Sequence, residues 1–294
     1  MNQTLFVCRF GTAAREVVGV LQRPPRGTEP RAAFLLARPM GMEATRTAAI
    51  YRVISDRLAR AGALVLRYDA HGCGDSPGEE RDQSLSGWVH DAASAHQALL
   101  DQLAELAQPA KLAQPASTPP LPVHWFGMGL GANVLLQAAA RVAPPPRSLV
   151  MWEPICDGPA YVGALQAAHR DELERQLAQP WSTLLARGWS HEPQLPGSVL
   201  GFEIGTQLTN DLLHLDPIEP WLPDLLRRGV RLTACLAPQD HHRLGTTDRP
   251  DPLDRPAGLS VHPVAERTNW MSSQAMGSAI VPPDLPRILT ALLT

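Results

Sequence analysis

A glycine-rich segment at residues 127–131 has the spacing of a catalytic turn but lacks the reactive side chain. It reads Gly127-Met128-Gly129-Leu130-Gly131, whereas the pattern G-x-S-x-G places a nucleophilic serine at the third position. That serine lies on a sharp turn between a strand and a helix, and small residues flank it because the two elements pack closely. Gly129 stands at the serine position and offers no oxygen or sulfur. An alternative interpretation is a flexible loop between a strand and a helix.

The segments around this turn have the periodicity of strands and helices. An apolar run, Leu121 to Phe126, precedes the turn, and a helix-like segment, Ala132 to Val142, follows it. Upstream, the apolar runs Ala32 to Ala37 and Ala63 to Tyr68 enclose Thr45 to Ala61, whose apolar residues recur at helical spacing. Strands that alternate with helices of this length indicate a parallel sheet with helices on both faces.

The rest of the chain predicts a hairpin before this parallel part and further strands after it. We expect antiparallel strands at Leu5 to Phe10 and Glu16 to Leu21, a helix from Leu85 to Leu103, strands at Arg147 to Trp152, Val199 to Gly205, Val230 to Ala237 and Leu259 to His262, and a last helix at Leu285 to Leu293. Residues 108–122 hold five prolines and are predicted to form a surface loop.

Two further loops and the glycine turn follow one another as in a known superfamily. Arg38-Pro39-Met40-Gly41 follows one strand, and a D-x-x-G-x-G-x-S loop, Asp69 to Ser76, follows the next. In this order and spacing the chain resembles the α/β-hydrolase superfamily, in its serine-aminopeptidase and lysophospholipase-like branch. It is most similar to the group called exosortase A system-associated hydrolase 2, through the continued turn G-x-x-L-G-A, Trp152 to Gly158, and Leu200 to Ile204.

The resemblance implies a single α/β domain over residues 1–294. Its fold would be a mostly parallel sheet with an N-terminal antiparallel hairpin, helices on both faces and a helical cap insertion at residues 155–197.

Hydrolysis on this fold needs a nucleophile, a histidine base, an acid and two backbone N–H groups that stabilise the oxyanion. By position, the oxyanion donors would be Leu130 and Met40, and the acid would be Asp240. An ordinary solvated loop aspartate is the alternative for Asp240.

The histidine base is missing from the loop in which the resemblance places it. That loop, Pro263 to Met271, contains no imidazole, and neither Thr268 nor Asn269 titrates near neutral pH. His262 is the nearest histidine, but it falls at the end of the predicted strand and would have to be displaced to serve.

Two other segments carry residue types that could replace the missing groups. Cys73 lies in the loop after a strand next to His71, and a thiolate beside an imidazole is a competent nucleophile, although a small residue is also expected there for turn geometry. Asp240-His241-His242 suggests a metal, but adjacent histidines on an extended segment point to opposite sides, and we predict a surface loop and no metal. The residues predicted to line a pocket are Arg38, Cys73, Met128, Glu153, Asp157 and Trp181, the last with ordinary core packing as its alternative.

Composition limits the possible partners. The chain has 294 residues, 44% of them hydrophobic, a net charge of −3 and a pI of about 6.4, which gives no general attraction to nucleic acid or anionic lipid. No apolar stretch approaches ~18 residues and Met1 to Phe10 lacks a basic start, so we expect no membrane insertion, no signal peptide and a cytoplasmic location. The four cysteines have no C-x-x-C spacing, and we predict neither zinc nor a cofactor. Oligomeric state is left open.

Two functions follow. In the first, a degenerate hydrolase keeps its fold and pocket but binds a ligand or partner; the resemblance implies an exosortase and exopolysaccharide setting and a small acyl or carrier-linked ligand. In the second, the chain is an ester or thioester hydrolase of unusual mechanism, with water activated by Asp240 or His262. The first is favoured, because a serine-hydrolase site without nucleophile or base keeps only a residual rate of order 10³ to 10⁴ over water.

Overall fold

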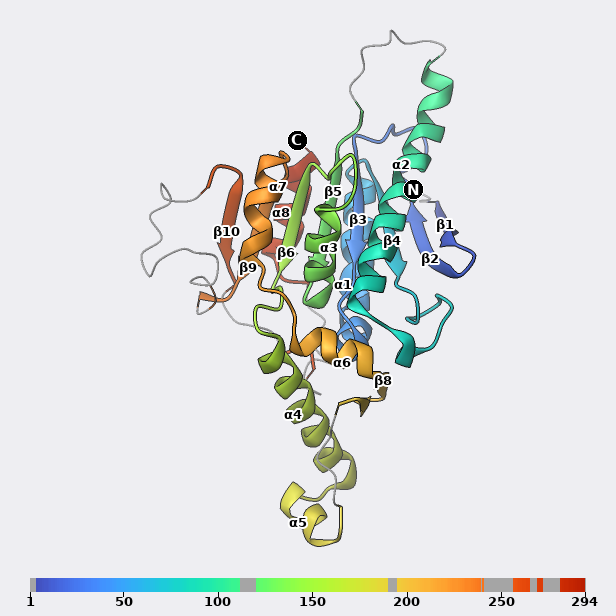
Figure 1. Cartoon of the computed structure of the whole chain (residues 1–294). Helices are drawn as coiled ribbons and strands as arrows, with labels where there is room; N and C mark the ends of the chain where they lie inside the picture. The colour runs from blue at the N-terminus through green and yellow to red at the C-terminus, as the bar shows by residue number, and fades with distance from the viewer. Residues whose placement is uncertain are drawn as a thin grey trace.

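A twisted sheet forms the centre of the molecule. The structure, a computed structural model, describes residues 4–111, 120–189, 195–238, 240, 256–264, 269–271 and 281–293. The strands of the central sheet are β1 (Leu5–Thr12), β2 (Arg15–Gln22), β3 (Ala32–Ala37), β4 (Ala63–Asp69), β5 (Val123–Met128), β6 (Ser148–Trp152), β9 (Arg231–Leu236) and β10 (Leu259–Pro263). Their order is β1-β2-β4-β3-β5-β6-β9-β10 (Figure 1). β1 and β2 pair antiparallel, as do β2 and β4, and every other neighbouring pair is parallel.

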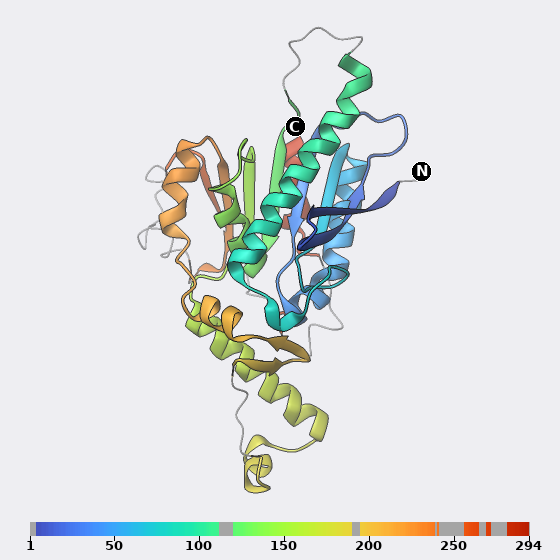
Figure 2. The same ribbon diagram turned by 45° about the vertical axis from the view of Figure 1, so that its right-hand side comes forward.

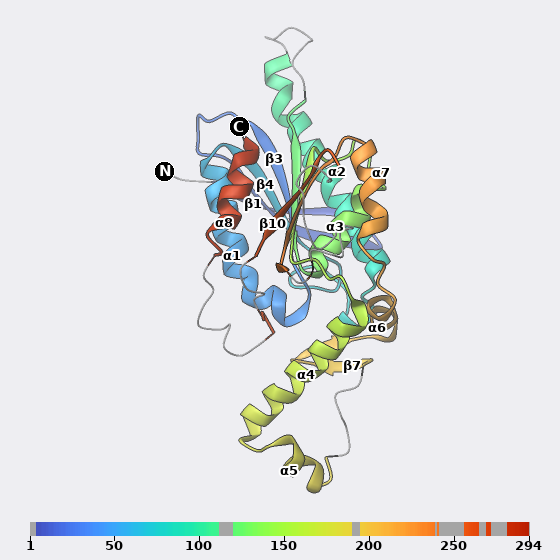
Figure 3. The same cartoon turned by 90° about the vertical axis from the view of Figure 1, so that its left-hand side faces the viewer.

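Helices cover both faces of this sheet, as the view in Figure 3 shows. One face carries α1 (Gly41–Arg60) and α8 (Asp284–Thr290), whose apolar side chains share one core cluster. The other carries α2 (Leu85–Lys111), α3 (Leu130–Ala139) and α7 (Leu222–Arg227), which share a second, larger cluster. The predicted mostly parallel sheet with an N-terminal antiparallel hairpin and helices on both faces is confirmed.

The sequence of β3 explains why helices cover both faces of the sheet. Successive side chains of a strand point to opposite faces, and all six residues of β3 are buried. Ala33 and Leu35 join the larger cluster, whereas Phe34 and Leu36 join the smaller one. Such a continuous apolar run is typical of a strand in a parallel sheet with helices on both faces.

The chain leaves the sheet between β6 and β9 and forms a separate group of elements. These are α4 (Gly158–Leu177), α5 (Trp181–Ala186), β7 (Gly197–Val199), β8 (Phe202–Ile204), α6 (Thr206–Leu213) and a 3₁₀ turn at Glu219–Trp221. They lie beyond the carboxyl end of β6, and α4 and α5 extend away from the sheet at the bottom of Figures 1 and 2. Two further 3₁₀ turns, at Glu80–Asp82 and Ala291–Leu293, complete the described elements.

Two element boundaries differ from the sequence predictions. The single strand expected over Val199 to Gly205 is a hairpin of β7 and β8, because Leu200 and Gly201 both have positive φ, 53° and 86°, and reverse the chain. The helix expected to end near Leu103 continues to Lys111, so the N-terminal part of the predicted surface loop is helical. Pro109 falls in its last turn, where one missing helical hydrogen bond affects only the helix end. Residues 112–119 of that loop lie outside the described residues.

Candidate functional site

The glycine frame forms a tight turn between β5 and α3. Gly129 has φ 51° and ψ −130°, and its N–H donates to the carbonyl of Trp152 at 3.0 Å. A Cβ atom at Gly127 would lie 2.7 Å from the backbone nitrogen of Ala132, and one at Gly131 would collide with the carbonyl oxygen of Arg38. The two flanking glycines are therefore required by close packing of the strand, the helix and the loop after β3.

Gly129 differs from its two neighbours because there is room for a side chain. A Cβ atom there would meet only Pro39 Cβ at 3.4 Å and Glu43 Oε2 at 3.8 Å, both ordinary contacts. Crowding therefore does not explain the glycine, although its positive φ favours one. The turn presents the space of a nucleophile without a nucleophilic atom.

A pocket of about 350 Å³ lies over Gly129. We call it the acidic pocket, after the four carboxylic side chains among its described lining residues, Glu43, Glu153, Asp157 and Asp240. Its volume lies at the lower end of the usual range for small-molecule sites, roughly 300 to 1,000 Å³. It therefore fits a compact ligand better than an extended one.

The sheet register brings several predicted residues to this pocket. Met128 at the end of β5 pairs with Trp152 at the end of β6, and Trp152 pairs with Cys235 of β9. Because these strands are parallel, the segments that follow them meet at one edge of the sheet, which is where ligands bind in such folds. The predicted pocket residues Met128, Glu153 and Asp157 and the predicted acid Asp240 all line the acidic pocket.

Glu43 and Tyr161 are functional candidates that the sequence analysis missed. Glu43 lies in the first turn of α1 and Tyr161 lies on α4, and the Tyr161 hydroxyl donates to Glu43 Oε2 at 2.6 Å. This bond connects two elements that are 118 residues apart in the chain. The available signal was the position of Glu43, directly after the loop that the resemblance assigns to oxyanion binding. No spacing rule connects that residue to α4.

The two predicted oxyanion donors lie next to the turn but face a second pocket. Met40 is the residue before α1 and Leu130 is the first residue of α3, so neither N–H belongs to the internal hydrogen bonds of its helix. Both residues line a neighbouring pocket of about 190 Å³, which shares Pro39 with the acidic pocket. Their role in oxyanion binding stays a prediction.

Arg38 and Cys73 belong to this second pocket and not to the acidic one. The Arg38 guanidinium forms an ion pair with Asp69, which keeps its side chain on the far side of the turn. Burial raises the pKa of the Cys73 thiol to about 12, so the thiol is protonated at neutral pH. The neighbouring imidazole of His71 has its Nδ1 3.3 Å from the carbonyl oxygen of Glu16. The geometry therefore does not support Cys73 as a replacement nucleophile.

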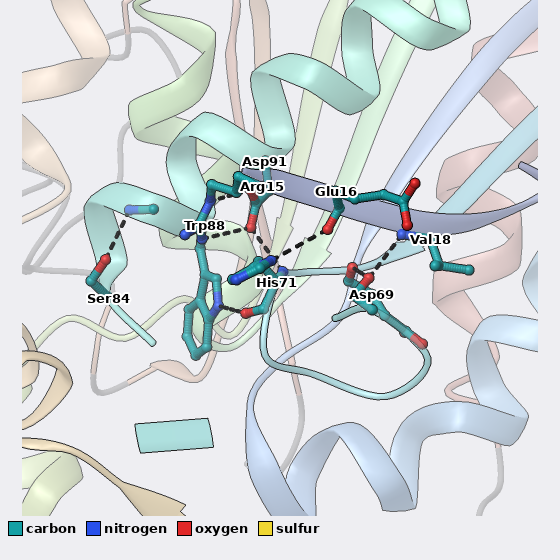
Figure 4. A network of polar contacts seen from close by, with 10 residues as sticks. Arg15, Glu16, Val18, Asp69, His71, Ser84, Trp88 and Asp91 are labelled. Atoms are coloured by element: carbon teal, nitrogen blue, oxygen red, sulfur yellow. Dashed lines mark hydrogen bonds and ion pairs between the residues drawn. The ribbon is translucent and has the colours of Figure 1, made fainter. Parts of the chain in front are cut away.

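The loop from Asp69 to Ser76 has a structural task that explains its polar residues (Figure 4). Asp91 of α2 accepts two hydrogen bonds from Arg15, at 2.6 and 2.9 Å, and a third from the His71 N–H at 2.9 Å. On the other side of the loop, the Ser76 hydroxyl accepts from the Val18 N–H at 2.8 Å. The network fastens the N-terminal hairpin to the loop and to α2. It involves none of the residues that line the acidic pocket.

Two other predicted residues lie away from the acidic pocket. His262 is exposed on β10, where it pairs with Cys235, and it lines a different depression beside α8. At this position on β10 its imidazole does not line the acidic pocket, so a catalytic role for His262 would still need the displacement that the sequence analysis named. Trp181 is buried at the start of α5, where the 20 residues of α4 have carried the chain away from the sheet (Figure 2).

The loop after β10 does reach the acidic pocket, but with an amide and not an imidazole. Asn269, Trp270 and Met271 line the pocket, and the Trp270 carbonyl accepts from Arg46 of α1 at 2.9 Å. Thr268 lies outside the described residues, as do His241 and His242.

Within the described ranges, no group of three or more histidine, cysteine, aspartate or glutamate side chains is arranged to hold a metal ion. In the same ranges no helix has the length and apolar character needed to cross a bilayer.

Solved structures share this architecture, although no protein-family model and no curated protein matches the sequence. The esterase Est1E from Butyrivibrio proteoclasticus, solved with ferulic acid, has a TM-score of 0.55 at 12% identity, with 97% of this chain and 96% of that chain covered. The proline iminopeptidase of Mycobacterium smegmatis has a TM-score of 0.54 at 13% identity, covering 98% and 97%. The α/β hydrolase GrgF from Penicillium sp. sh18 has a TM-score of 0.55 at 18% identity, covering 100% and 97%.

The chain has the α/β-hydrolase fold. At these identities the likeness concerns the fold alone, and fold does not establish activity.

Proposed function

We propose that this chain is a ligand-binding protein on the α/β-hydrolase fold that lacks the hydrolytic chemistry of that fold. Gly129 carries the proposal: it adopts the turn in which a nucleophile is expected, with space for a side chain, and supplies no reactive atom. Among the described residues that line the acidic pocket, none is a serine, a threonine or a histidine. A pocket whose described lining has neither the serine nor the histidine can bind a ligand but lacks the pair that starts acyl transfer on this fold.

Cys156 is the one thiol among the described lining residues, and its surroundings oppose catalysis. Its Sγ lies 3.5 Å from the carbonyl oxygen of Pro154, to which it donates. A nucleophilic cysteine requires a thiolate, which cationic neighbours stabilise and anionic ones destabilise. The charged side chains in the described lining, Glu43, Glu153, Asp157 and Asp240, are all acidic.

For the biological setting we propose a cytoplasmic role beside exosortase and exopolysaccharide machinery, with an acyl group as ligand, free or carried on a pantetheine arm. The setting rests on the sequence resemblance. The second pocket supports the acyl group, because Val134, Phe202 and Ile204 give it apolar walls next to the backbone of Met40 and Leu130. An acyl chain can lie along such walls with its carbonyl near two N–H groups.

One observation favours a second candidate function. Asp240 lines the acidic pocket, as an acid of a hydrolase site would, and a carboxylate in that place can activate a water molecule. The second candidate is therefore an ester or thioester hydrolase without a covalent intermediate. His262 does not line this pocket, so Asp240 is the stronger of the two residues that the sequence offered for activating water.

Two measurements on the purified chain separate these functions. A fluorophosphonate probe should leave the protein unlabelled, and turnover of short acyl esters and thioesters should equal that of the Asp240→Asn variant and of buffer. For binding, fatty acids and acyl-pantetheines should stabilise the fold against heat, since a ligand at 100 times its dissociation constant adds about 2.7 kcal/mol. Turnover that Asp240→Asn abolishes would establish the second candidate, and labelling at any residue would reject the first.

A further inference from the structure

We infer that the sheet face of the N-terminal hairpin, beside α1, docks an acidic amphipathic helix of a partner protein. We call it the hairpin face: it consists of Leu5 and Val7 on β1, Val20 on β2 and Arg67 on β4, with Arg52 of α1 close to Arg67. The inference is independent of the proposed function, because none of these residues lines either pocket beside the glycine turn.

The register of the sheet defines the hairpin face. Val7 pairs with Val20, and Val20 pairs with Arg67. Arg67 pairs in turn with Leu36 of β3. Residues paired across neighbouring strands project to the same side of a sheet, so these four form one row. Leu36 is fully buried in the core cluster of α1, whereas Val7, at the edge of the sheet, is 75% exposed (Figure 1). Cover from the described helices therefore ends within this row.

Arg67 carries a half-buried charge without a counter-ion. Among the described residues its side chain has no ion pair and no hydrogen bond, and its Nε is sealed from solvent without an acceptor. Buried charges are normally paired, because taking a lone charge out of water is costly. Burial, and then the positive charges of Arg38 and Arg52, lower the pKa of Arg67. Since arginine stays protonated in proteins, this position keeps a positive charge that a carboxylate would neutralise.

The other charges next to the row are either paired or positive. Arg9 forms an ion pair with Glu16 on the same hairpin. Arg38 forms an ion pair with Asp69. Arg52 is exposed and has no ion pair among the described residues. The hairpin face therefore combines exposed apolar side chains with the unpaired charges of two arginines, and an acidic partner is its electrostatic complement.

The shape of the hairpin face fits a helix better than a membrane or a second copy of the chain. β2 separates β1 from β4, so two strand spacings of ~4.8 Å lie between them, and a helix with its side chains is ~10–12 Å wide. α1 stands on the sheet next to this floor, so a flat bilayer would meet α1 before it reached Arg67 (Figure 3). Two copies joined face to face by a two-fold axis would bring their unpaired arginines together, and like charges repel.

The test uses a stapled helical peptide of about 18 residues, which has the length of the eight-residue strand β1. One version carries a leucine stripe flanked by glutamates, and the other has lysine in place of every glutamate. Binding to the purified full chain is measured by fluorescence anisotropy. We expect the glutamate peptide to bind about 10-fold or more tightly than the lysine peptide, the size of one charge-assisted hydrogen bond. Equal binding of the two peptides, or no binding of the glutamate peptide, overturns the inference.

Two variants test the assigned residues. Arg67→Gln removes the charge and Val7→Ser removes the most exposed apolar side chain of the row, and each should weaken the glutamate peptide about 10-fold or more. Arg141→Gln is the matched control and should leave the affinity unchanged, since Arg141 is exposed and follows α3 on the other face of the sheet. Unchanged affinity in a folded Arg67→Gln protein contradicts the role of Arg67.

A second measurement separates docking from a structural role of Arg67. Arg67→Met removes the unpaired charge and keeps a long side chain, so without peptide it should leave the midpoint of thermal unfolding unchanged or raise it. A fall of more than about 4 °C would show that the isolated fold needs Arg67, and would contradict the inference.

The other occupants give different results. A dimer in sedimentation that Val7→Ser dissociates would assign the hairpin face to a second copy of the chain. Binding to phosphatidylglycerol vesicles that Arg67→Gln abolishes would assign it to a membrane. Either result overturns the inference.

Discussion

Replacing Gly129 with serine restores the missing hydroxyl and tests whether the rest of a catalytic site is present. The substitution is sterically possible, because a Cβ atom there would have Pro39 at 3.4 Å and Glu43 Oε2 at 3.8 Å as its nearest neighbours. The new hydroxyl would face a carboxyl group held by Tyr161, and no histidine lies among the described lining residues. We expect the variant to fold and to remain inactive.

The cost in stability follows from the backbone. A residue with a Cβ atom at φ 51° and ψ −130° is strained, and such conformations cost on the order of 1–3 kcal/mol each. Gly129→Ser should therefore lower the free energy of unfolding by about 1–3 kcal/mol, measured by urea denaturation. Gly129→Ala is the matched control and should lower it by the same amount within about 0.5 kcal/mol, because the strain belongs to the Cβ atom and not to the hydroxyl.

The activity of this variant decides the functional argument. A serine without its base retains at most the residual rate that binding and oxyanion donors supply, of order 10³ to 10⁴ over water. Ester turnover by Gly129→Ser should therefore stay at the level of Gly129→Ala, and a fluorophosphonate probe should label neither. Labelling of the serine variant alone would show that a base and an oxyanion site are intact, and the interpretation as a degenerate site would be refuted.

Three further predictions concern groups outside the acidic pocket. Acid should destabilise the fold through His124, because burial lowers its pKa from 6.5 to about 4 in the folded chain. The unfolded chain takes up a proton on His124 near pH 6.5, whereas the folded chain does so only near pH 4. The contribution of neutral His124 to the free energy of unfolding is therefore fully present above pH 6.5, and about 3 kcal/mol of it is lost as pH falls toward 4. His124→Asn should flatten the dependence of the free energy of unfolding on pH over that range, as urea denaturation will measure. Iodoacetamide at pH 8 should leave Cys73 unmodified in the folded protein, because burial raises the pKa of its thiol to about 12, and should alkylate it in urea. Peptide mass spectrometry measures the modification, and reaction in the folded state would support Cys73 as a nucleophile. Asp91→Ala should lower the free energy of unfolding in urea by about 3–5 kcal/mol, because it leaves Arg15 without its buried carboxylate partner. The control Asp101→Ala removes an exposed carboxylate on the same helix and should cost less than about 0.5 kcal/mol. Similar losses for both variants would show that the hydrogen bonds of Asp91 do not anchor the N-terminal hairpin.

The glycine turn could be predicted from the sequence because its requirements are local. Gly127 and Gly131 are needed by backbone contacts within a few residues or with the adjacent loop, so the frame remains recognisable without its serine. Glu153, Asp157 and Asp240 could be placed for a related reason. Each follows a parallel strand, and the carboxyl ends of neighbouring parallel strands meet at one edge of the sheet.

The remaining members of the pocket could not be predicted because tertiary packing decides them. Tyr161 reaches Glu43 only because α4 passes over the glycine turn, and no periodicity in α4 indicates that direction. The same limit applies to Arg38, which lines the second pocket and not the acidic one because its guanidinium pairs with Asp69. Trp181 is buried at the start of α5, as its core-packing alternative expects, and the length of α4 sets its distance from the sheet.

The lost nucleophile and the acidic lining support each other energetically. Acyl transfer at this turn would generate an oxyanion, and enzymes stabilise that charge with donors and positive groups. A carboxylate near a developing oxyanion does not stabilise that charge, because like charges repel. The Glu43 oxygen lies 3.8 Å from the Cβ position of residue 129, and three more acids share the pocket. The described lining of this pocket therefore presents carboxylates where acyl transfer would need positive or neutral donors, which agrees with a turn that has no nucleophile.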